Sequence, residues 1–350
     1  MDEERFTHAL VEWYRAGHRD LPWRRTRDPY RIWISEIMCQ QTQVDTVVPR
    51  YERFVARFPD VATLASVGEE TVCEEWAGLG YYSRARNLHR AACAVVREHA
   101  GAMPQTATEL LKLPGIGRYT AGAIASIAYA EVTPVVDGNV GRVLSRVYRL
   151  DDVPTSPKGQ RVLWERAAGL VPADGPGDFN QALMELGALV CTPKSPKCLL
   201  CPVRGDCAAY AEGDVDRFPT PKPRAKRKRL DVAFAWIESE AGVWLEQRGL
   251  DGLWAGLWEL PSAEGSSALA KRVGRKRLPK PLAVIEHTLS HRDVVASVYA
   301  VAAPDPVPEH WRQSAQPLGE PLSALARKAI QAVAPPELLE KRAPPDAKDR

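Results

Sequence analysis

The sequence of 350 residues lacks any run of 18 apolar residues, so we expect no membrane-spanning helix. Its first residues, Met-Asp-Glu-Glu-Arg, lack the basic segment and apolar core of a secretory signal, and we expect a cytoplasmic protein. The chain also has little excess charge, because a net charge of +3 does not by itself indicate a nucleic-acid partner. What remains is a chain long enough for about two domains, with 45% hydrophobic residues to build their cores.

Cysteine is scarce, but four of the seven cysteines are clustered. Cys191, Cys198, Cys201 and Cys207 follow the spacing C-x6-C-x2-C-x5-C. In a chain without a secretory signal, this cluster predicts a metal site rather than disulfides. Zinc is one candidate, although only the C-x2-C pair has the spacing of a zinc knuckle, and an iron–sulfur cluster is the other.

Residues 113–146 contain the pattern around which the first half of the chain is organised. Pro114, Gly115 and Gly117 predict a tight turn between two helices. The free backbone N–H groups at the start of the second helix would bind a phosphate. Asp137 follows at the head of a further helix. The pattern indicates a helix-hairpin-helix with a downstream aspartate. The alternative is an ordinary glycine turn in which Asp137 serves only as an N-cap.

A largely apolar helix is predicted over residues 30–44. Glu36, Gln40 and Gln43 are spaced i, i+4 and i+7 in it, so we expect them to share one face. A carboxyl group in such surroundings holds its proton more tightly, which suits a general acid. The alternative is that Glu36 lies on an exposed stripe and has no chemical role.

Several segments between residues 6 and 210 carry one resemblance. They are Leu21–Arg24, Ser35–Val44, Gly78–Leu88, the hairpin, Val136–Val140, Phe179–Ala188 and the four cysteines. Together they resemble the MutY-type family of adenine DNA glycosylases, which belongs to the endonuclease III superfamily of helix-hairpin-helix enzymes. The resemblance implies a mostly α-helical glycosylase domain over residues 1–215, with a [4Fe–4S] cluster held by the cysteine loop 191–207.

The resemblance also implies a reaction. The family excises adenine mispaired with 8-oxoguanine or guanine in double-stranded DNA, by base flipping and acid-catalysed hydrolysis of the N-glycosidic bond, in base excision repair. Glu36 would protonate the adenine, and Asp137 would stabilise the positive charge on the sugar. Asn139 and Tyr119 would orient these groups. Further residues map onto the adenine pocket, namely Trp23, Arg24, Val44, Gln181 and Met184, and onto the DNA contacts, namely Gln41, Tyr81, Gly115 and Gly117.

The residue at position 119 distinguishes enzymes that only remove a base from enzymes that also cleave the DNA strand. Superfamily members with lyase activity carry a lysine there, whose amine attacks the sugar as a Schiff-base nucleophile. Tyr119 cannot form an imine. Gly141 likewise stands where some family members carry a lysine. We therefore expect a monofunctional enzyme that leaves an abasic site.

The second half of the chain begins with a basic, proline-containing linker over residues 216–230, followed by alternating apolar residues typical of strands. Gly252–Pro261 resembles the glycine–tryptophan segment of the family's Nudix-like (MutT-like) C-terminal domain. This resemblance implies an α+β domain for 8-oxoguanine recognition over residues 231–335. The acidic Arg-Glu-x-x-Glu-Glu helix that holds magnesium in Nudix hydrolases is absent, so we expect binding without hydrolysis.

Leu289, Ser290 and His291 match the family's 8-oxoguanine recognition loop, with leucine where many relatives have an aromatic residue. Residues 336–350 are rich in Pro, Lys and Asp, which predicts a disordered tail. We expect a monomer associated with the nucleoid. Two other functions stay open: another glycosylase/lyase of the endonuclease III type, and a non-catalytic iron–sulfur DNA-binding protein.

Overall fold

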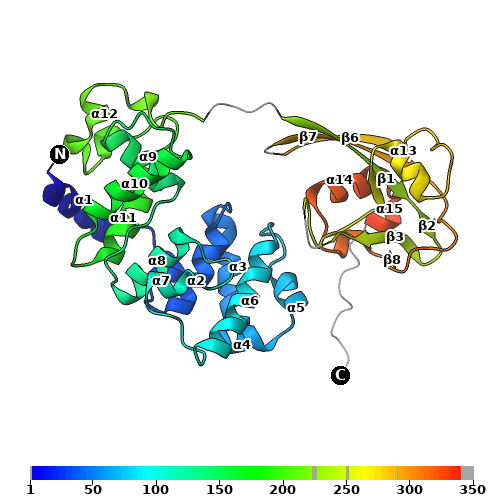
Figure 1. The fold of residues 1–350 in the computed structure, drawn as a ribbon, viewed down its shortest axis with the longest axis horizontal. Helices are drawn as coiled ribbons and strands as arrows, with labels where there is room; N and C mark the ends of the chain where they lie inside the picture. The colour runs from blue at the N-terminus through cyan, green and yellow to red at the C-terminus, as the bar shows by residue number, and fades with distance from the viewer. Residues whose placement is uncertain (1, 223–226, 250–251, 290, 340–350) are drawn as a thin grey trace. The chain divides into compact units, whose positions relative to one another are not determined.

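The computed structural model describes residues 2–222, 227–249, 252–289 and 291–339. The chain divides into two compact units, Met1–Pro223 and Arg224–Arg350 (Figure 1). The first unit is helical and the second combines two small sheets with helices, which confirms the predicted fold class. No helix in the described ranges is both long and apolar enough to cross a membrane.

The first unit is built from α-helices joined by short 3-10 turns. Its α-helices are α1 (Glu3–Gly17), α2 (Pro29–Cys39), α3 (Val44–Arg57), α4 (Val61–Ser66), α5 (Glu69–Glu75), α6 (Ser83–Glu98), α7 (Ala107–Leu110), α8 (Arg118–Tyr129), α9 (Gly138–Val147), α10 (Pro157–Leu170), α11 (Pro176–Leu189) and α12 (Ala208–Ala211). The 3-10 turns are η1 (Pro22–Arg24), η2 (Cys198–Leu200), η3 (Arg204–Asp206) and η4 (Val215–Arg217).

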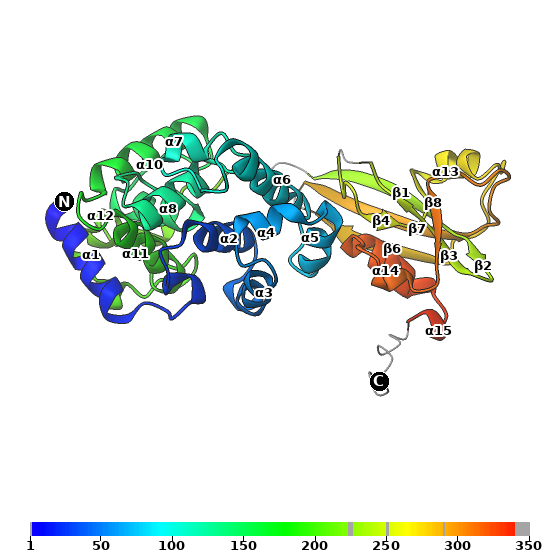
Figure 2. The same ribbon diagram turned by 90° about the horizontal axis from the view of Figure 1, so that it is seen from below.

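Helix α8 lies at the centre of this unit, and its run of small side chains lets other helices approach closely. Helices α2 and α11 both pack on α8 (Figure 2). Helix α9 packs on α11. A Cβ added at Gly177 on α11 would lie 2.6 Å from the carbonyl oxygen of Ser126 on α8. This packing brings the C-terminal end of α2 and the N-terminal ends of α8 and α9 to one region.

The hairpin forms as predicted and precedes α8. Gly115 has a φ of +75°, and a Cβ there would lie 2.6 Å from Cβ of Asn87, so both the conformation and the space require glycine. Gly117 is the N-cap residue of α8, which has no side-chain cap at this end. The first backbone N–H groups of α8 are therefore not occupied by a capping side chain.

The prediction of one helix over residues 30–44 is wrong at its C-terminal end. Helix α2 ends at Cys39, the chain turns at Gln41 with a φ of +55°, and α3 begins at Val44. Gln43 therefore does not share a helical face with Glu36. A left-handed residue commonly ends a helix, but that residue is usually glycine. The sequence offers no glycine here to signal the turn.

The second unit contains two four-stranded sheets. Its strands are β1 (Lys228–Trp236), β2 (Glu238–Ser239), β3 (Gly242–Gln247), β4 (Trp258–Glu259), β5 (Ser262–Glu264), β6 (Ala283–Thr288), β7 (Arg292–Ala300) and β8 (Trp311–Ser314). One sheet has the order β5-β1-β7-β6, with β1 parallel to β7 and the other pairs antiparallel. The other has the order β2-β3-β4, with β8 also paired to β3.

Strand β1 is buried on both faces because the remaining helices cover them. Ala233 and Ala235 pack with Leu269 of α13 (Ser266–Arg272), while Phe234 packs in the cluster that contains α14 (Ala324–Val333). The unit also has the 3-10 turn η5 (Pro317–Gly319) and the short helix α15 (Pro336–Leu339). Residues 223–226 of the predicted linker and 340–350 of the predicted tail lie outside the described residues.

The close approach of α8 and α11 generates a stability prediction. Gly177→Ala should destabilise the protein by about 1–3 kcal/mol, because the added methyl group meets backbone atoms that cannot move aside. Gly169→Ala on α10 is the matched control, since nothing lies within 4 Å of its added Cβ. It should stabilise the protein by about 0.4–1 kcal/mol. Urea unfolding measures both, and equal stabilities of the two variants would contradict the packing described here.

Candidate active site

One cavity of about 760 Å³ opens between η1, α2, α8, α9 and α11, a volume ordinary for a small-molecule site. The residues predicted for catalysis and for the adenine pocket all line it. Those residues are Glu36, Asp137, Asn139 and Tyr119, together with Trp23, Arg24, Val44, Gln181 and Met184. Of the residues predicted to contact DNA, Gln41, Gly115 and Gly117 line the same cavity, whereas Tyr81 lies on a loop with 61% of its surface exposed.

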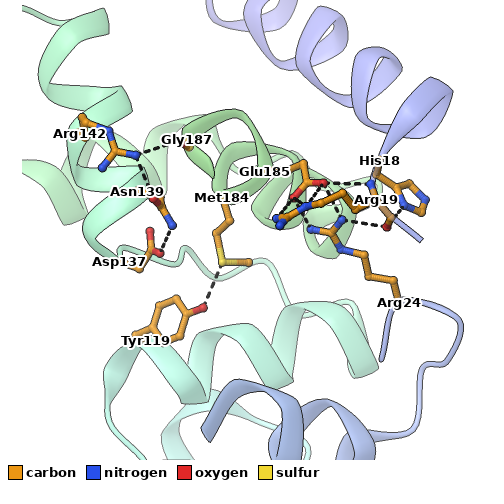
Figure 3. A network of polar contacts seen from close by, with 10 residues as sticks. All are labelled: His18, Arg19, Arg24, Tyr119, Asp137, Asn139, Arg142, Met184, Glu185 and Gly187. Carbon is orange, nitrogen blue, oxygen red and sulfur yellow. Dashed lines mark hydrogen bonds and ion pairs between the residues drawn. The ribbon is translucent and has the colours of Figure 1, made fainter. Parts of the chain in front are cut away.

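Glu36 lies on α2 with its carboxyl group inside this cavity. Burial raises the pKa of Glu36 to about 7, while a hydrogen bond from Tyr119 acts in the opposite direction. The Tyr119 hydroxyl donates to Glu36 Oε2 at 2.6 Å. The same hydroxyl lies 3.1 Å from Met184 Sδ (Figure 3). A carboxyl group that keeps its proton near neutral pH can act as a general acid.

Asp137 caps helix α9 and also faces the cavity. Its Oδ1 accepts a hydrogen bond from Val140 N at 2.7 Å, and its Oδ2 accepts one from Asn139 Nδ2 at 3.0 Å. Burial raises the pKa of Asp137, and these hydrogen bonds oppose that rise by stabilising the carboxylate. The capping interpretation and the catalytic one are therefore compatible, because one oxygen caps the helix while the group lines the cavity.

Arg142 fixes the orientation of Asn139. Its Nη2 donates to Asn139 Oδ1 at 2.9 Å and to Gly187 O at 2.7 Å (Figure 3). Its Nε donates to Cys191 O at 2.8 Å. The amide of Asn139 must then present its Nδ2 to Asp137. A chain of hydrogen bonds thus runs from Asp137 to the backbone at the first cysteine of the cluster.

A buried ion-pair network occupies the opposite side of the cavity (Figure 3). Glu185 on α11 is fully buried, and Arg24 donates to its two oxygens at 2.9 and 2.8 Å. Arg19 donates to the same carboxylate through its backbone and its side chain. Burial would raise the pKa of Glu185, but the hydrogen bonds from Arg24 and Arg19 outweigh it and lower the pKa to about 2.

Arg19 and Glu185 line the cavity but were not among the residues predicted from the sequence. A usable signal existed for Glu185, because it is the one charged residue in the apolar run 182–189 and buried carboxylates are paired. Arg19 has no such local signal, since its partner lies 166 residues away.

The four clustered cysteines line a second, small cavity beside α9. Arg146 is buried there and donates to Cys191 Sγ at 3.3 Å and to Thr192 O at 2.8 Å. Among the described residues, no three His, Cys, Asp or Glu side chains converge closely enough to hold a single metal ion. Four thiols around one small cavity are a donor set that suits an iron–sulfur cluster, in which each cysteine binds a different iron atom.

Comparison with known proteins gives three matches along the chain. Residues 34–168 match the model of the HhH-GPD superfamily of base excision DNA repair proteins. Residues 191–207 match the iron–sulfur binding domain of endonuclease III, and residues 232–332 match the NUDIX domain. Curated relatives include the adenine DNA glycosylase of Mus musculus, which is 39% identical over 86% of this chain and 71% of its own length.

The chain belongs to the adenine DNA glycosylase family. The adenine DNA glycosylase of Homo sapiens is 40% identical over 85% of this chain and 67% of its own length, and that of Buchnera aphidicola from Schizaphis graminum is 36% identical over 73% and 74%. Among solved structures, a thermostable thymine-DNA glycosylase matches with a TM-score of 0.56 and 30% identity, over 60% of this chain and 97% of its own. An endonuclease III–DNA complex at 21% identity, with a TM-score of 0.52 over 61% and 98%, supports the fold.

The family match and the cysteine geometry agree on the cofactor. Cys191, Cys198, Cys201 and Cys207 are the ligands available for the family's [4Fe–4S] cluster, and the predicted cofactor is confirmed. A cluster held by these four cysteines would crosslink the loop after α11 to the segment before α12. Arg146 satisfies the loop's carbonyl groups from the side of α9.

The second unit of this family member has the Nudix fold but lacks the acidic helix of the Nudix hydrolases. The first turn of α13 carries no acidic residue, and the buried carboxylates Glu246 and Glu259 are instead paired with Arg272 and Arg248. The predicted recognition loop joins β6 to β7, where Leu289 packs on the core and His291 is exposed. Ser290 lies outside the described residues.

The pKa of about 7 for Glu36 predicts the pH dependence of base excision. Excision should slow as the pH rises through about 7, because the general acid loses its proton. Tyr119→Phe removes the hydrogen bond that favours the carboxylate, so the pKa of Glu36 should rise and the alkaline limb should move to higher pH. Single-turnover rates across a pH series measure both, and a limb that moves to lower pH in the variant would contradict this account.

Proposed function

We propose that the protein removes adenine mispaired with 8-oxoguanine or guanine from double-stranded DNA and leaves an abasic site. The observation that carries this proposal is the pairing of Glu36 and Asp137 in one cavity large enough for a nucleobase. The two carboxyl groups sit in different surroundings, one held protonated by burial and one hydrogen-bonded as an N-cap. Two carboxyl groups with different protonation states are what acid-assisted glycoside hydrolysis requires.

The reaction begins with extrusion of the adenine, because its glycosidic bond is unreachable inside the helix. The base enters between Trp23, Val44 and Met184, where Arg24 and Gln181 supply polar contacts. Glu36 then donates its proton to adenine N7, which makes the base a better leaving group. As the glycosidic bond breaks, positive charge develops on the sugar.

Asp137 stabilises that positive charge, and Asn139 holds the carboxylate in position through its hydrogen bond. Glu36 is ionised after proton transfer and can accept a proton from the attacking water. The hydroxyl of Tyr119 remains bonded to Glu36 and supports this ionised form. No amine stands at position 119 to form an imine, so the reaction ends at the abasic site.

DNA is held at several points in this proposal. The free N–H groups at the start of α8, after Gly115 and Gly117, bind a backbone phosphate. Gln41 and Tyr81 enter the duplex near the mispair. The bound [4Fe–4S] cluster orders the cysteine loop, and the exposed Lys194 lies on that loop for phosphate contact. The β6–β7 loop of the second unit, with Leu289, Ser290 and His291, recognises 8-oxoguanine.

Two substitutions test the catalytic pair. Asp137→Asn keeps a good helix cap but removes the charge, so excision should fall by about 10²-fold or more while the unfolding temperature changes little. Glu36→Gln removes the acid and should cost a similar factor. Single-turnover release of adenine, with thermal unfolding as the control, measures these effects. Full activity of Asp137→Asn would mean that Asp137 serves only as a cap.

The opposite base tests the substrate and the two alternative functions. Adenine should be released from duplexes with A opposite 8-oxoguanine or G, and far more slowly from A opposite T. Strand scission without added base would instead indicate a glycosylase/lyase. Duplex affinity with no adenine released from any substrate would indicate a non-catalytic iron–sulfur DNA-binding protein.

A further inference from the structure

Arg84, the second residue of α6, makes an unusual number of contacts with backbone carbonyl groups. Its Nη1 donates to the carbonyl oxygens of Ile37 at 2.8 Å, Met38 at 3.1 Å and Gln40 at 2.5 Å. These carbonyl groups belong to the C-terminal end of α2, where no intrahelical N–H remains to satisfy them. A positive charge is also favourable there because of the helix dipole.

The second η nitrogen of Arg84 reaches a different segment. Nη2 donates to the carbonyl oxygens of Leu79 at 2.9 Å and Gly80 at 3.2 Å, and to Thr42 Oγ1 at 3.2 Å. One half-buried guanidinium thus joins the turn after α2 to the loop before α6. The fixed fork of an arginine can hold two segments in this way, whereas a lysine cannot.

The two segments end in residues with the same unusual backbone conformation. Gln41 has a φ of +55° and Tyr81 a φ of +47°, and neither is a glycine. A left-handed conformation at such residues costs about 1–2 kcal/mol and persists only where the surroundings enforce it. Arg84 binds the carbonyl group immediately before each of them, at Gln40 and at Gly80.

Aromatic contacts complete the arrangement. The guanidinium centre of Arg84 lies 5.6 Å from the ring centroid of Tyr81 and 5.4 Å from that of Trp76. Trp76 is buried and donates its Nε1–H to the carbonyl oxygen of Gly80 at 3.1 Å. The exposed Tyr81 ring is therefore backed by a cation that is itself anchored on the core.

We propose that Arg84 is a positioning residue that couples Gln41 and Tyr81, so that both enter the duplex together. Arg84 does so by holding both segments against the end of α2, the helix that carries Glu36. This inference rests on the proposed function, because that function assigns Gln41 and Tyr81 to the duplex. Holding both loop tips before DNA binds avoids the entropic cost of ordering them at the moment of extrusion. The two residues that extrude the adenine are then held at a fixed position relative to Glu36, the general acid.

The first test measures coupling in the protein with Arg84 intact. Gln41→Ala and Tyr81→Ala should each weaken base extrusion, reported by the fluorescence of 2-aminopurine placed next to the target adenine. The fold-reduction in extrusion of the double variant should be smaller than the product of the two single fold-reductions. The reason is that removing either side chain already prevents the two from entering the duplex together. Multiplicative effects would overturn the proposal without touching the proposed function, since the wild-type protein would still release adenine.

The second test uses Arg84→Lys. Arg90→Gln on the same helix is the matched control, because the contact of Arg90 in the described part of the chain is an ion pair with Glu69 at the surface. Arg84→Lys should reduce extrusion by about 10- to 100-fold and make the Gln41 and Tyr81 effects multiplicative. The alkaline limb of the pH profile should stay in place, because the contacts of Glu36 are unchanged. Wild-type extrusion by Arg84→Lys, or a shifted alkaline limb, would overturn the proposal. The absence of adenine release from the wild-type protein would overturn the proposed function instead.

Discussion

The burial of one carboxyl group is the constraint on which the first unit depends. Glu36 needs surroundings poor in water to keep its proton, yet it shares its cavity with two further carboxyl groups, Asp137 and Glu185. The three differ in their hydrogen-bond partners: Glu185 has two arginines, Asp137 has a helix N-terminus and an amide, and Glu36 has the phenol of Tyr119. The proton therefore resides on the group with the weakest compensation.

Three helix ends lie beside this cavity, and each is treated differently. The N-terminus of α9 stabilises the carboxylate of Asp137, and the N-terminus of α8 keeps its N–H groups available beside the same cavity. The C-terminus of α2 is stabilised by Arg84 rather than by a glycine cap. Three helix ends thus add backbone dipoles to the charges of the side chains at one cavity.

The sequence predicts those parts of the site that local patterns encode. The hairpin, the Asp137 cap and the acid on an apolar helix are all short-range features, and the cavity contains each of them. The turn at Gln41 was missed because its left-handed conformation is enforced by Arg84, which lies 44 residues from the carbonyl group of Gln40 that it binds. Long-range partners leave no periodic trace in the sequence.

The second unit shows the same limit. The apolar alternation in β1 predicts a strand, but the parallel pairing of β1 with β7 depends on residues more than 60 positions apart. The absence of the acidic Nudix motif can be read from the sequence, whereas the ion pairs formed by the remaining carboxylates cannot. Two ion pairs, Glu246 with Arg272 and Glu259 with Arg248, now line the cavity between β3, β4, β5 and α13.

These ion pairs bear on what the second unit can do. Both oxygens of Glu246 accept hydrogen bonds, from Arg272, from the backbone of Ser262 and from Trp311. This carboxylate therefore has little capacity left for a divalent cation, which needs several unpaired oxygen ligands. Breaking either pair would leave a buried charge without compensation, so the pairs hold the arrangement in place once it has formed. The fold is thereby kept while Glu246 is withdrawn from metal binding.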